Sequence, residues 1–216
     1  MRVRRVGAAV ALGVSLLCAP GRARADGLAG PSLAPETRIA EALYTVRTES
    51  ALQDARQAWV LLGWGGLNLL GGTAVALSGA GGDLGRSVAV NSLVWGAVNV
   101  AVSIPWLLMV RAEQRSAPVE RALRGPRLRD RREELMRERY GQALVFGVNT
   151  GLDVAYVATG VLLSLLALQQ TPRNDALLGV GAAAAGQGAF LLAFDFAGWM
   201  TSVGRANRIA GVPRGD

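Results

Sequence analysis

The segment from Phe146 to Gly160 is apolar overall but carries three polar side chains, those of Asn149, Asp153 and Tyr156. In an α-helix with about 3.6 residues per turn, positions i, i+4 and i+7 lie on one face. A carboxylate or amide at bilayer depth needs a partner and often marks a proton or ion pathway. The spacing therefore predicts one of two roles for this face: polar adhesion between helices, or handling of a proton or ion by Asp153.

Other chemistry is restricted by residue types that the chain lacks. It contains no histidine and a single cysteine, Cys18, which excludes zinc sites, disulfides within the chain, and catalysis by His or Cys. No glycine-rich phosphate-binding loop and no serine-nucleophile motif is present either. We therefore predict that the protein is not an enzyme, has no catalytic residue, and binds no metal or cofactor.

The hydrophobic residues, 51% of the chain, are concentrated in four charge-poor segments. These segments run from Trp59 to about Leu77, from about Val88 to Val110, from about Ala143 to Leu168, and from about Ala176 to Trp199. Each is long enough to cross a hydrocarbon core of about 30 Å as a helix of roughly 20 residues. The predicted fold is all-α: an integral membrane bundle of four transmembrane helices, arranged as two antiparallel hairpins, with an additional N-terminal amphipathic helix.

The chain divides into six expected regions. Residues 1–25 show the basic, apolar and A-x-A parts of a signal peptide. A periplasmic lead-in and amphipathic helix (26–58) and the first transmembrane hairpin (59–110) follow. An Arg/Glu-rich connecting loop (111–142), the second transmembrane hairpin (143–204) and a C-terminal tail (205–216) complete the chain. A signal peptide followed by membrane helices indicates the inner membrane of a bacterium.

The net charge of +7 comes from arginine alone, because the 23 basic residues include no lysine. Cleavage of the signal peptide would remove five of them and leave 18 arginines against 16 acidic residues. The connecting loop mixes both signs and has few aromatic residues, so we predict no nucleic-acid binding. The membrane orientation stays open: a cleaved signal peptide places this loop outside, whereas the positive-inside rule favours the cytoplasm.

Depth along the predicted helices brings polar side chains from all four segments to a similar level. Counted at about 1.5 Å per residue from the side of the connecting loop, one amide or carboxylate per helix lies at roughly 14 to 18 Å. These residues are Asn68, Asn99, Asp153 and Gln187. The same count places Asn149 and Asp195 at roughly 6 to 9 Å, so that Asp153 and Asp195 are expected about two turns apart.

The polar layer formed by Asn68, Asn99, Asp153 and Gln187 has two interpretations. Interhelical hydrogen bonds worth about 0.6 to 2 kcal/mol each would hold the bundle together, and this is the interpretation that we favour. Alternatively, Asp153 passes a proton or a cation through the layer. The expected depth difference between Asp153 and Asp195 argues against a catalytic pair of carboxylates. Gly147 and Gly151 have the GxxxG spacing that allows helices to approach closely.

A short repeat flanks this layer, since Trp64 to Asn68 and Trp95 to Asn99 share the pattern W-G-x-x-N at a separation of 31 residues. The motifs LLGWGGLN, NSLVWGAVN, FGVNTGLDVAY and GQGAFLLAFD lie between Ala58 and Trp199. Together they resemble a family of bacterial membrane proteins of unknown function with a signal peptide and four hydrophobic helices. The resemblance implies no activity. It implies that the marked positions are Trp64, Asn68, Trp95, Asn99, Asn149, Asp153, Tyr156, Gln187 and Asp195.

The expected function is that of a small integral membrane protein of unknown role, whose polar layer holds its helices together. One alternative is a proton- or ion-coupled membrane component that uses Asp153. Another is an accessory subunit of an envelope or transport complex. Besides the lipid bilayer, the expected partners are a second copy of the chain, in a homo-oligomer, or another membrane protein.

Overall fold

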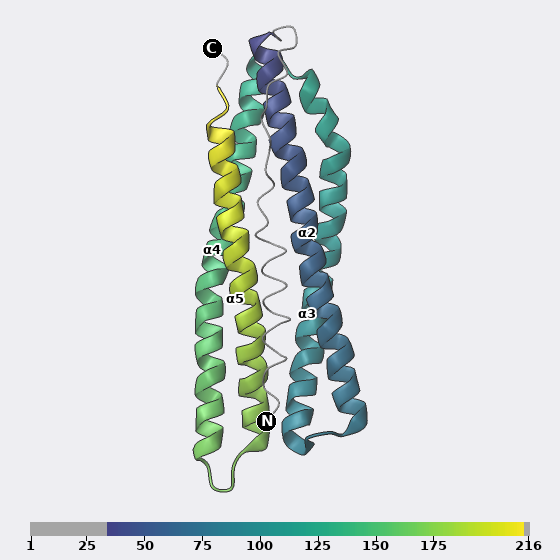
Figure 1. The fold of residues 1–216 in the computed structure, drawn as a ribbon, viewed down its shortest axis with the longest axis vertical. Helices are drawn as coiled ribbons and strands as arrows, with labels where there is room; N and C mark the ends of the chain where they lie inside the picture. Colours follow the sequence, from purple (N-terminus) through teal and green to yellow (C-terminus); the bar gives the residue numbers. More distant parts are fainter. Residues whose placement is uncertain (1–33, 214–216) are drawn as a thin grey trace, which may run out of the picture. The chain divides into compact units, whose positions relative to one another are not determined.

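Figure 1 shows the computed structural model of the chain, which describes residues 34–213. Within this range the chain forms four long helices and one short 3-10 helix, without any strand. The elements are α2 (Pro35–Ser78), α3 (Gly82–Ser116), η1 (Ala117–Ala122), α4 (Gly125–Gln169) and α5 (Asp175–Ala210). The predicted all-α bundle of four helices is confirmed, whereas the predicted signal peptide lies outside the described residues.

All four long helices are long and apolar enough to cross a membrane, as predicted. Helix α4 illustrates the reason, because Leu144, Val148 and Leu152 follow one another at four-residue spacing and are all largely exposed. A continuous stripe of large apolar side chains is unfavourable in water, whereas lipid chains solvate it. The exposed surface of α4 therefore fits the interior of a bilayer.

Helix α2 joins two elements that the sequence pattern separates. The amphipathic helix expected within residues 26–58 and the first span form one uninterrupted helix, Pro35–Ser78. Gln57, Ala58 and Trp59 at the expected boundary include neither Gly nor Pro, so nothing there interrupts the backbone hydrogen bonds. The charged and apolar parts of α2 consequently belong to a single helix.

The Arg/Glu-rich connecting segment, residues 111–142, is mostly helical in the structure. Helix α3 continues to Ser116 and α4 begins at Gly125, so that η1 and two further residues separate them. The break coincides with Pro118 in η1 and Pro126 in the first turn of α4. Proline cannot donate the backbone hydrogen bond of a helix interior, and these two prolines contribute to the interruption between α3 and α4.

The described residues pack into two compact units. One, called here the charged unit, comprises the described residues up to Arg56, Leu108–Val145, and the described residues from Ala197 onward. The other, called the apolar unit, comprises Gln57–Leu107 and Phe146–Phe196. Each of the four long helices contributes to both units, so the helices that carry the predicted polar residues also carry most of the charges.

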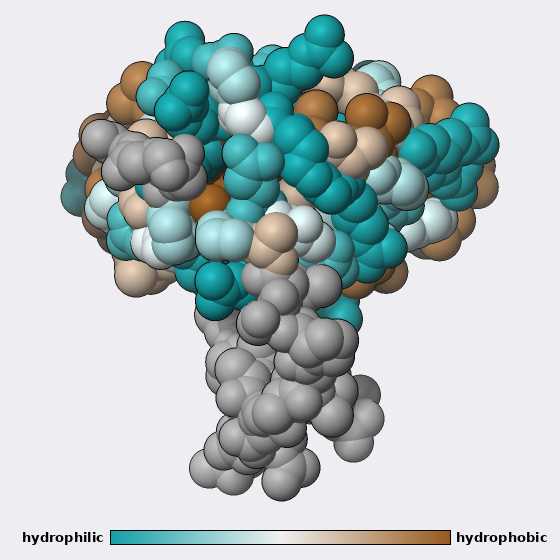
Figure 2. Space-filling view, turned by 90° about the horizontal axis from the view of Figure 1, so that it is seen from above, coloured by the Kyte–Doolittle hydropathy of each residue, from teal (hydrophilic) through white to brown (hydrophobic). Residues whose placement is uncertain are grey.

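The charged unit has an apolar centre built from the first part of α2, the first part of α4 and the end of α5. Its buried members are Ile39, Ala40, Leu43, Leu128, Leu135, Ile209 and Val212. Figure 2, a view from above, shows a largely hydrophilic face with hydrophobic side chains toward its edges. The charged residues of this unit therefore surround a small apolar core, which the packed parts of α2 and α4 and the end of the described chain share.

In the apolar unit, glycines let neighbouring helices touch through their backbones. A Cβ atom added at Gly160 of α4 would lie 2.4 Å from the backbone nitrogen of Ala185 in α5. In the first hairpin, a Cβ atom added at Gly96 of α3 would lie 2.9 Å from the carbonyl oxygen of Gly65 in α2. Both separations are too short for real atoms, so only glycine permits these contacts, and the contacts fix the register of each hairpin.

Candidate functional site

Two carboxyl groups meet in the apolar unit. Asp153 of α4 and Asp195 of α5 are each 7% exposed, and their carboxyl groups lie close enough to interact directly. Two carboxylates that share one buried site repel each other, so one of the two favours the protonated form. A pair that holds one proton and one negative charge is therefore the favoured state of this site.

This contact corrects the expectation that Asp153 and Asp195 differ in depth by about two turns. Helices α4 and α5 pack with Gly188 beside Val157, where an added Cβ atom would lie 3.1 Å from the Val157 nitrogen. In this register the two aspartates are about three residues, or roughly 4.5 Å, apart along the helices, a gap that two side chains bridge. The sequence count began at the ends of the apolar segments, which do not lie at one level.

A cavity of about 400 Å³ lies beside the carboxyl pair, within the apolar unit. All four long helices contribute to its wall, and among the described residues no arginine does. The lining residues are Leu61, Trp95, Asn99, Val102, Trp106, Phe146, Asn149, Leu152, Asp153, Tyr156, Leu191, Phe194 and Asp195. A mostly apolar wall with a few polar groups, at a volume of roughly 300 to 1,000 Å³, is typical of sites for small molecules.

Three aromatic side chains from three helices meet at this cavity. The ring centroid of Trp106 lies 6.2 Å from that of Phe146 and 6.4 Å from that of Phe194, and the two phenylalanine rings are 6.3 Å apart. Tilted and edge-to-face contacts at such distances are favourable. The three rings therefore support one another and form an apolar wall next to the carboxyl pair.

Two buried polar atoms of the cavity wall have no hydrogen-bond partner within residues 34–213. They are Nδ2 of Asn99, a residue that is 3% exposed, and Oδ2 of Asp153. Leaving a buried polar group without a partner costs about 1 to 3 kcal/mol. A native protein tolerates this cost where water, an ion or a ligand supplies the missing partner. The cavity wall thus includes two residues that each carry a buried polar atom without a partner, one a donor and one an acceptor.

Both tryptophans of the W-G-x-x-N repeat connect the two hairpins. Nε1 of Trp64 in α2 donates to Oε1 of Gln187 in α5, at 2.7 Å. Nε1 of Trp95 in α3 donates to the hydroxyl oxygen of Tyr156 in α4, at 2.8 Å. The indole of Trp64 also stacks on Phe190, with ring centroids 4.2 Å apart. Polar contact between the hairpins therefore depends on tryptophan N–H groups as well as on amides.

The predicted polar layer is divided between different contacts. Asn99 and Asp153 both line the cavity, as do the flanking residues Asn149 and Tyr156. Gln187 is buried and bonded to a tryptophan, and it is not part of the cavity wall. The structure therefore brings the amide of α3 together with the carboxylates of α4 and α5, and it places the amide of α5 elsewhere.

Asn68 is the member of the polar layer that contacts its own helix. Its Nδ2 donates to the carbonyl oxygen of Trp64, at 2.9 Å, and its side chain is half-buried. Asn99 packs beside Gly65 in the α2–α3 hairpin, about one helical turn from the level of Asn68. The sequence count placed them together because it took Trp59 and Val110 as helix ends at one level, whereas α2 begins at Pro35 and α3 continues to Ser116.

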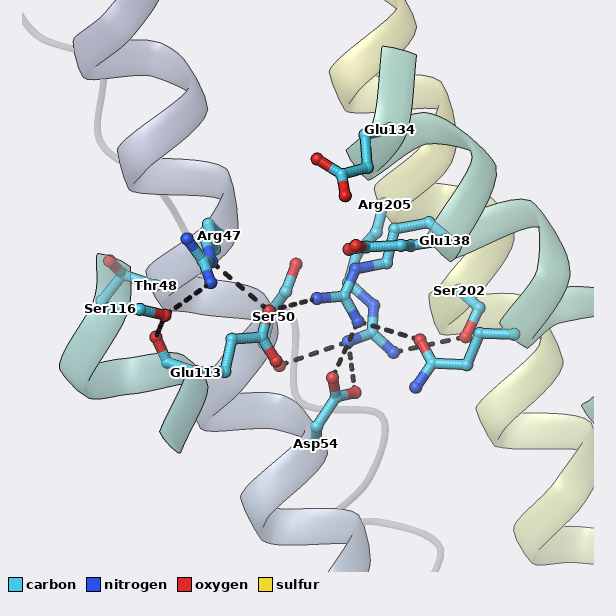
Figure 3. Close-up of polar contacts among 12 residues, drawn as sticks. Arg47, Thr48, Ser50, Asp54, Glu113, Ser116, Glu134, Glu138, Ser202 and Arg205 are labelled. Carbon is cyan, nitrogen blue, oxygen red and sulfur yellow. Dashed lines mark hydrogen bonds and ion pairs between the residues drawn. The ribbon is translucent and has the colours of Figure 1, made fainter. Parts of the chain in front are cut away.

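The charged unit contains a buried network of ion pairs that the sequence did not predict (Figure 3). Arg205 of α5 is fully buried and donates to Oδ1 of Asp54 in α2 and, at 3.2 Å, to the carbonyl oxygen of Ser50. Arg139 of α4 donates to Oδ2 of Asp54 at 2.8 Å and to Glu113 of α3 at 2.9 Å. A single carboxylate of α2 thus binds guanidinium groups from α4 and α5.

A second part of the network is centred on Glu120 of η1, which is also buried. Arg47 of α2 donates to its Oε1, and Arg131 of α4 donates to the same oxygen at 2.9 Å. Arg47 also donates to the hydroxyl of Ser116 at 2.8 Å. Burial opposes the charge of Arg131, but its hydrogen bonds to Glu134 and Glu120 outweigh burial and raise its pKa. The arginines in this part of the chain therefore act as fixed cations that join α2, η1 and α4.

A helical spacing in α2 could have revealed this network. The buried residues of α2 follow one face that passes from apolar to polar and back to apolar. They include Leu43, Arg47, Ser50, Asp54, Gln57 and Leu61. The sequence predicted only an amphipathic helix here. Charged side chains are rarely fully buried unless they are paired, so the charged residues on this buried face indicate ion pairs with other helices.

Residues 60–196 match a protein family described as a family of unknown function (DUF6992). The matched range covers more than half of the chain and includes the carboxyl pair, the residues that line the cavity and both W-G-x-x-N segments. The comparisons with curated proteins and with solved structures gave no match. The chain has four helices that are long and apolar enough to cross a membrane. On the strength of the match over residues 60–196, it belongs to this family of unknown function.

Proposed function

We propose that the protein is a proton-coupled component of a bacterial inner membrane, in which the Asp153–Asp195 pair binds and releases a proton. The observation that carries this proposal is the pairing of two buried carboxyl groups at the wall of one cavity. Carboxyl groups at bilayer depth are typical of proton relays and ion pathways. No arginine among the described lining residues balances the pair, so its charge depends on protons and on what enters the cavity.

Loss of the shared proton would change the contact between α4 and α5. Two carboxylates about 4 Å apart repel each other by about 4 kcal/mol at an effective dielectric constant of about 20. This repulsion acts across the helix pair that packs closely at Gly160 and Ala185. The protonated pair therefore favours closely packed helices, whereas the ionised pair favours separated helices or a bound cation. Because the two protonation states favour different helix packing or different cation occupancy, proton release is coupled to helix separation or to cation binding.

Infrared spectroscopy of the full chain in lipid nanodiscs tests this proposal. We expect a stretching band of a protonated carboxyl group that disappears as the pH is raised. The band should change its position or its titration in Asp153→Asn and in Asp195→Asn, because one buried carboxyl group remains in each. It should be absent from the double variant Asp153→Asn/Asp195→Asn and should persist unchanged in Asp130→Asn, because Asp130 is an exposed residue of the charged unit. A titrating band that remains unchanged in the double variant would assign the proton to another group and overturn the proposal.

A second role, adhesion between helices, is supported by the bonds from Trp64 to Gln187 and from Trp95 to Tyr156. Hydrogen bonds between membrane helices contribute about 0.6 to 2 kcal/mol each. This role requires no proton exchange, and the same residues can serve it while the carboxyl pair titrates. Membership in an envelope or transport complex and homo-oligomer formation stay predictions.

A further inference from the structure

We infer that the cavity beside Asp153 and Asp195 binds a small apolar amine in its protonated form and that the carboxyl pair releases its shared proton when the amine binds. The inference rests on the proposed function, because it names the class of molecule that exchanges with the proton. Three observations support it: the cavity wall has acidic groups but no arginine, two buried polar atoms of the lining residues lack partners, and aromatic rings line the same cavity.

The charge of the wall selects a cation. The titratable side chains that face the cavity are those of Asp153, Tyr156 and Asp195, all from α4 and α5. Helices α2 and α3 contribute apolar, indole and amide groups, none of which titrates. An anion would therefore meet a carboxylate and no basic partner, whereas an ammonium group would meet two carboxyl groups.

The two unpartnered atoms indicate which polar groups the ligand should carry. Oδ2 of Asp153 lacks a donor and Nδ2 of Asn99 lacks an acceptor, and both residues are more than nine-tenths buried at the cavity wall. An ammonium group donates to the carboxylate oxygen, and a hydroxyl or carbonyl oxygen on a neighbouring carbon accepts from the amide. An amine with an adjacent oxygen thus satisfies both atoms, which an amine alone does not.

The aromatic residues indicate that the remaining part of the ligand is apolar. Trp106, Phe146 and Phe194 form a cluster of rings at the same cavity, and Trp95 is a further lining residue. Apolar groups pack favourably against such rings, and an ammonium group near a ring face gains a cation–π interaction. The volume of about 400 Å³ accommodates one aromatic ring with a short chain.

Exchange of one proton for one ammonium group keeps the charge of the site constant. The singly protonated pair carries one proton and one negative charge. After release of the proton the pair carries two negative charges, and the bound ammonium returns the total to one negative charge. Such an exchange avoids an uncompensated second charge at bilayer depth. A metal ion is a poorer fit, because within residues 34–213 no cluster of three or more His, Cys, Asp or Glu side chains is placed to hold one.

Binding to the full chain in lipid nanodiscs can be followed through tryptophan fluorescence, because Trp95 and Trp106 line the cavity. Four probes share an aromatic ring: 2-amino-1-phenylethanol, 2-phenylethylamine, 2-phenylethanol and phenylacetate. We expect saturable binding of the two amines, tighter for the amino alcohol, and at least tenfold weaker binding of the neutral alcohol and the anion. The amine dissociation constant should fall by up to tenfold for each unit of pH increase while the pair is protonated, because one proton is released.

Variants separate the roles of the two polar atoms. Asp153→Asn should weaken binding of both amines at least tenfold, and the double variant Asp153→Asn/Asp195→Asn should abolish both amine binding and its pH dependence. Asn99→Leu should retain 2-phenylethylamine binding but remove the preference for the amino alcohol. Asp130→Asn should bind as wild type does, and circular dichroism should show that each variant keeps its helices. Equal binding of phenylacetate and the amines, no saturable amine binding, or unchanged amine binding in Asp153→Asn would each overturn the inference.

The two proposals fail in distinguishable ways. If the carboxyl infrared band titrates but no amine binds, the proton-coupled role is retained and the amine site is wrong. If amines bind without any dependence on pH and no carboxyl band titrates, the exchange for a proton is wrong and so is the proposed function. Detection of acid released into a weakly buffered sample on addition of 2-amino-1-phenylethanol supports both proposals.

Discussion

Asp54 and Asp153 are both buried carboxylates on long helices, yet they obtain their partners in different ways. Asp54 accepts hydrogen bonds from Arg139 and Arg205, so its negative charge is balanced by fixed cations. Asp153 has Asp195 beside it and depends on a proton that can leave. The first arrangement stabilises a structure, whereas the second can respond to its surroundings.

Replacement of Asp54 by Asn should destabilise the protein by about 3 to 5 kcal/mol, the usual cost of removing one partner from a buried ion pair. Burial already lowers the pKa of Arg205, and Asp54 opposes this effect. Without Asp54, Arg205 and Arg139 would lie near each other as buried cations without a shared carboxylate. The free energy of unfolding in detergent, measured by denaturant titration, gives the loss directly.

Glu49→Gln is the matched control for Asp54→Asn. It removes the pair between Glu49 and Arg208, whose side chains are 42% and 50% exposed. An exposed pair contributes about 0 to 1 kcal/mol, so this variant should unfold almost as wild type does. Equal losses in the two variants would show that the buried network contributes no more than a surface pair.

At the scale of elements, the four helices and their turns were predictable, whereas their register was not. The interruption between α3 and α4 follows from the local sequence, because Pro118 and Pro126 act on the backbone nearby. The GxxxG pair that includes Gly151 predicted a close helix contact, but a Cβ atom there would meet nothing within 4 Å. The close contact is at Gly160, which faces Gly181 and Ala185. Local conformation follows from local sequence, but which glycine faces a neighbour depends on the other helix.

Gly160→Ala and Gly151→Ala test this difference in register. The first places a methyl group 2.4 Å from the Ala185 nitrogen and 2.7 Å from the Gly181 carbonyl oxygen, so α4 and α5 must separate, at a cost of about 1 to 3 kcal/mol. The second places a methyl group in open space and should be neutral or stabilise by up to about 1 kcal/mol, since alanine favours helix. Unfolding titrations of both variants give the comparison, and a neutral Gly160→Ala would rule out the close helix contact.

At the scale of the whole molecule, the candidate residues were predictable by type, but their grouping was not. Asp153, Asp195 and Asn99 stand out in the sequence because polar groups are rare in apolar segments. That they share a cavity depends on the contacts between three helices, which residue counting within each helix does not determine. Arg205 and Asp54 are 151 residues apart in the chain, so no local pattern could pair them.

The membrane orientation can be tested with a reporter enzyme that is active only in the periplasm. If all four helices cross the membrane, the η1 connection and the end of α5 lie on one side and the α2–α3 turn lies on the other. A cleaved signal peptide would put the η1 connection in the periplasm, so a reporter inserted between Leu123 and Arg124 should be active and one inserted at Ala80 inactive. The opposite result would place the η1 connection in the cytoplasm and contradict the predicted signal peptide.

The two hairpins contribute unequally to the cavity. Both acidic groups come from the second hairpin, α4 and α5, whereas the first hairpin supplies neutral groups such as Asn99 and Trp106. The number of protons exchanged per ligand is therefore set by the second hairpin, while the first can alter which ligand is preferred. A chimera that keeps α4 and α5 and takes α2 and α3 from another member of the family should then change its selectivity without changing its proton stoichiometry.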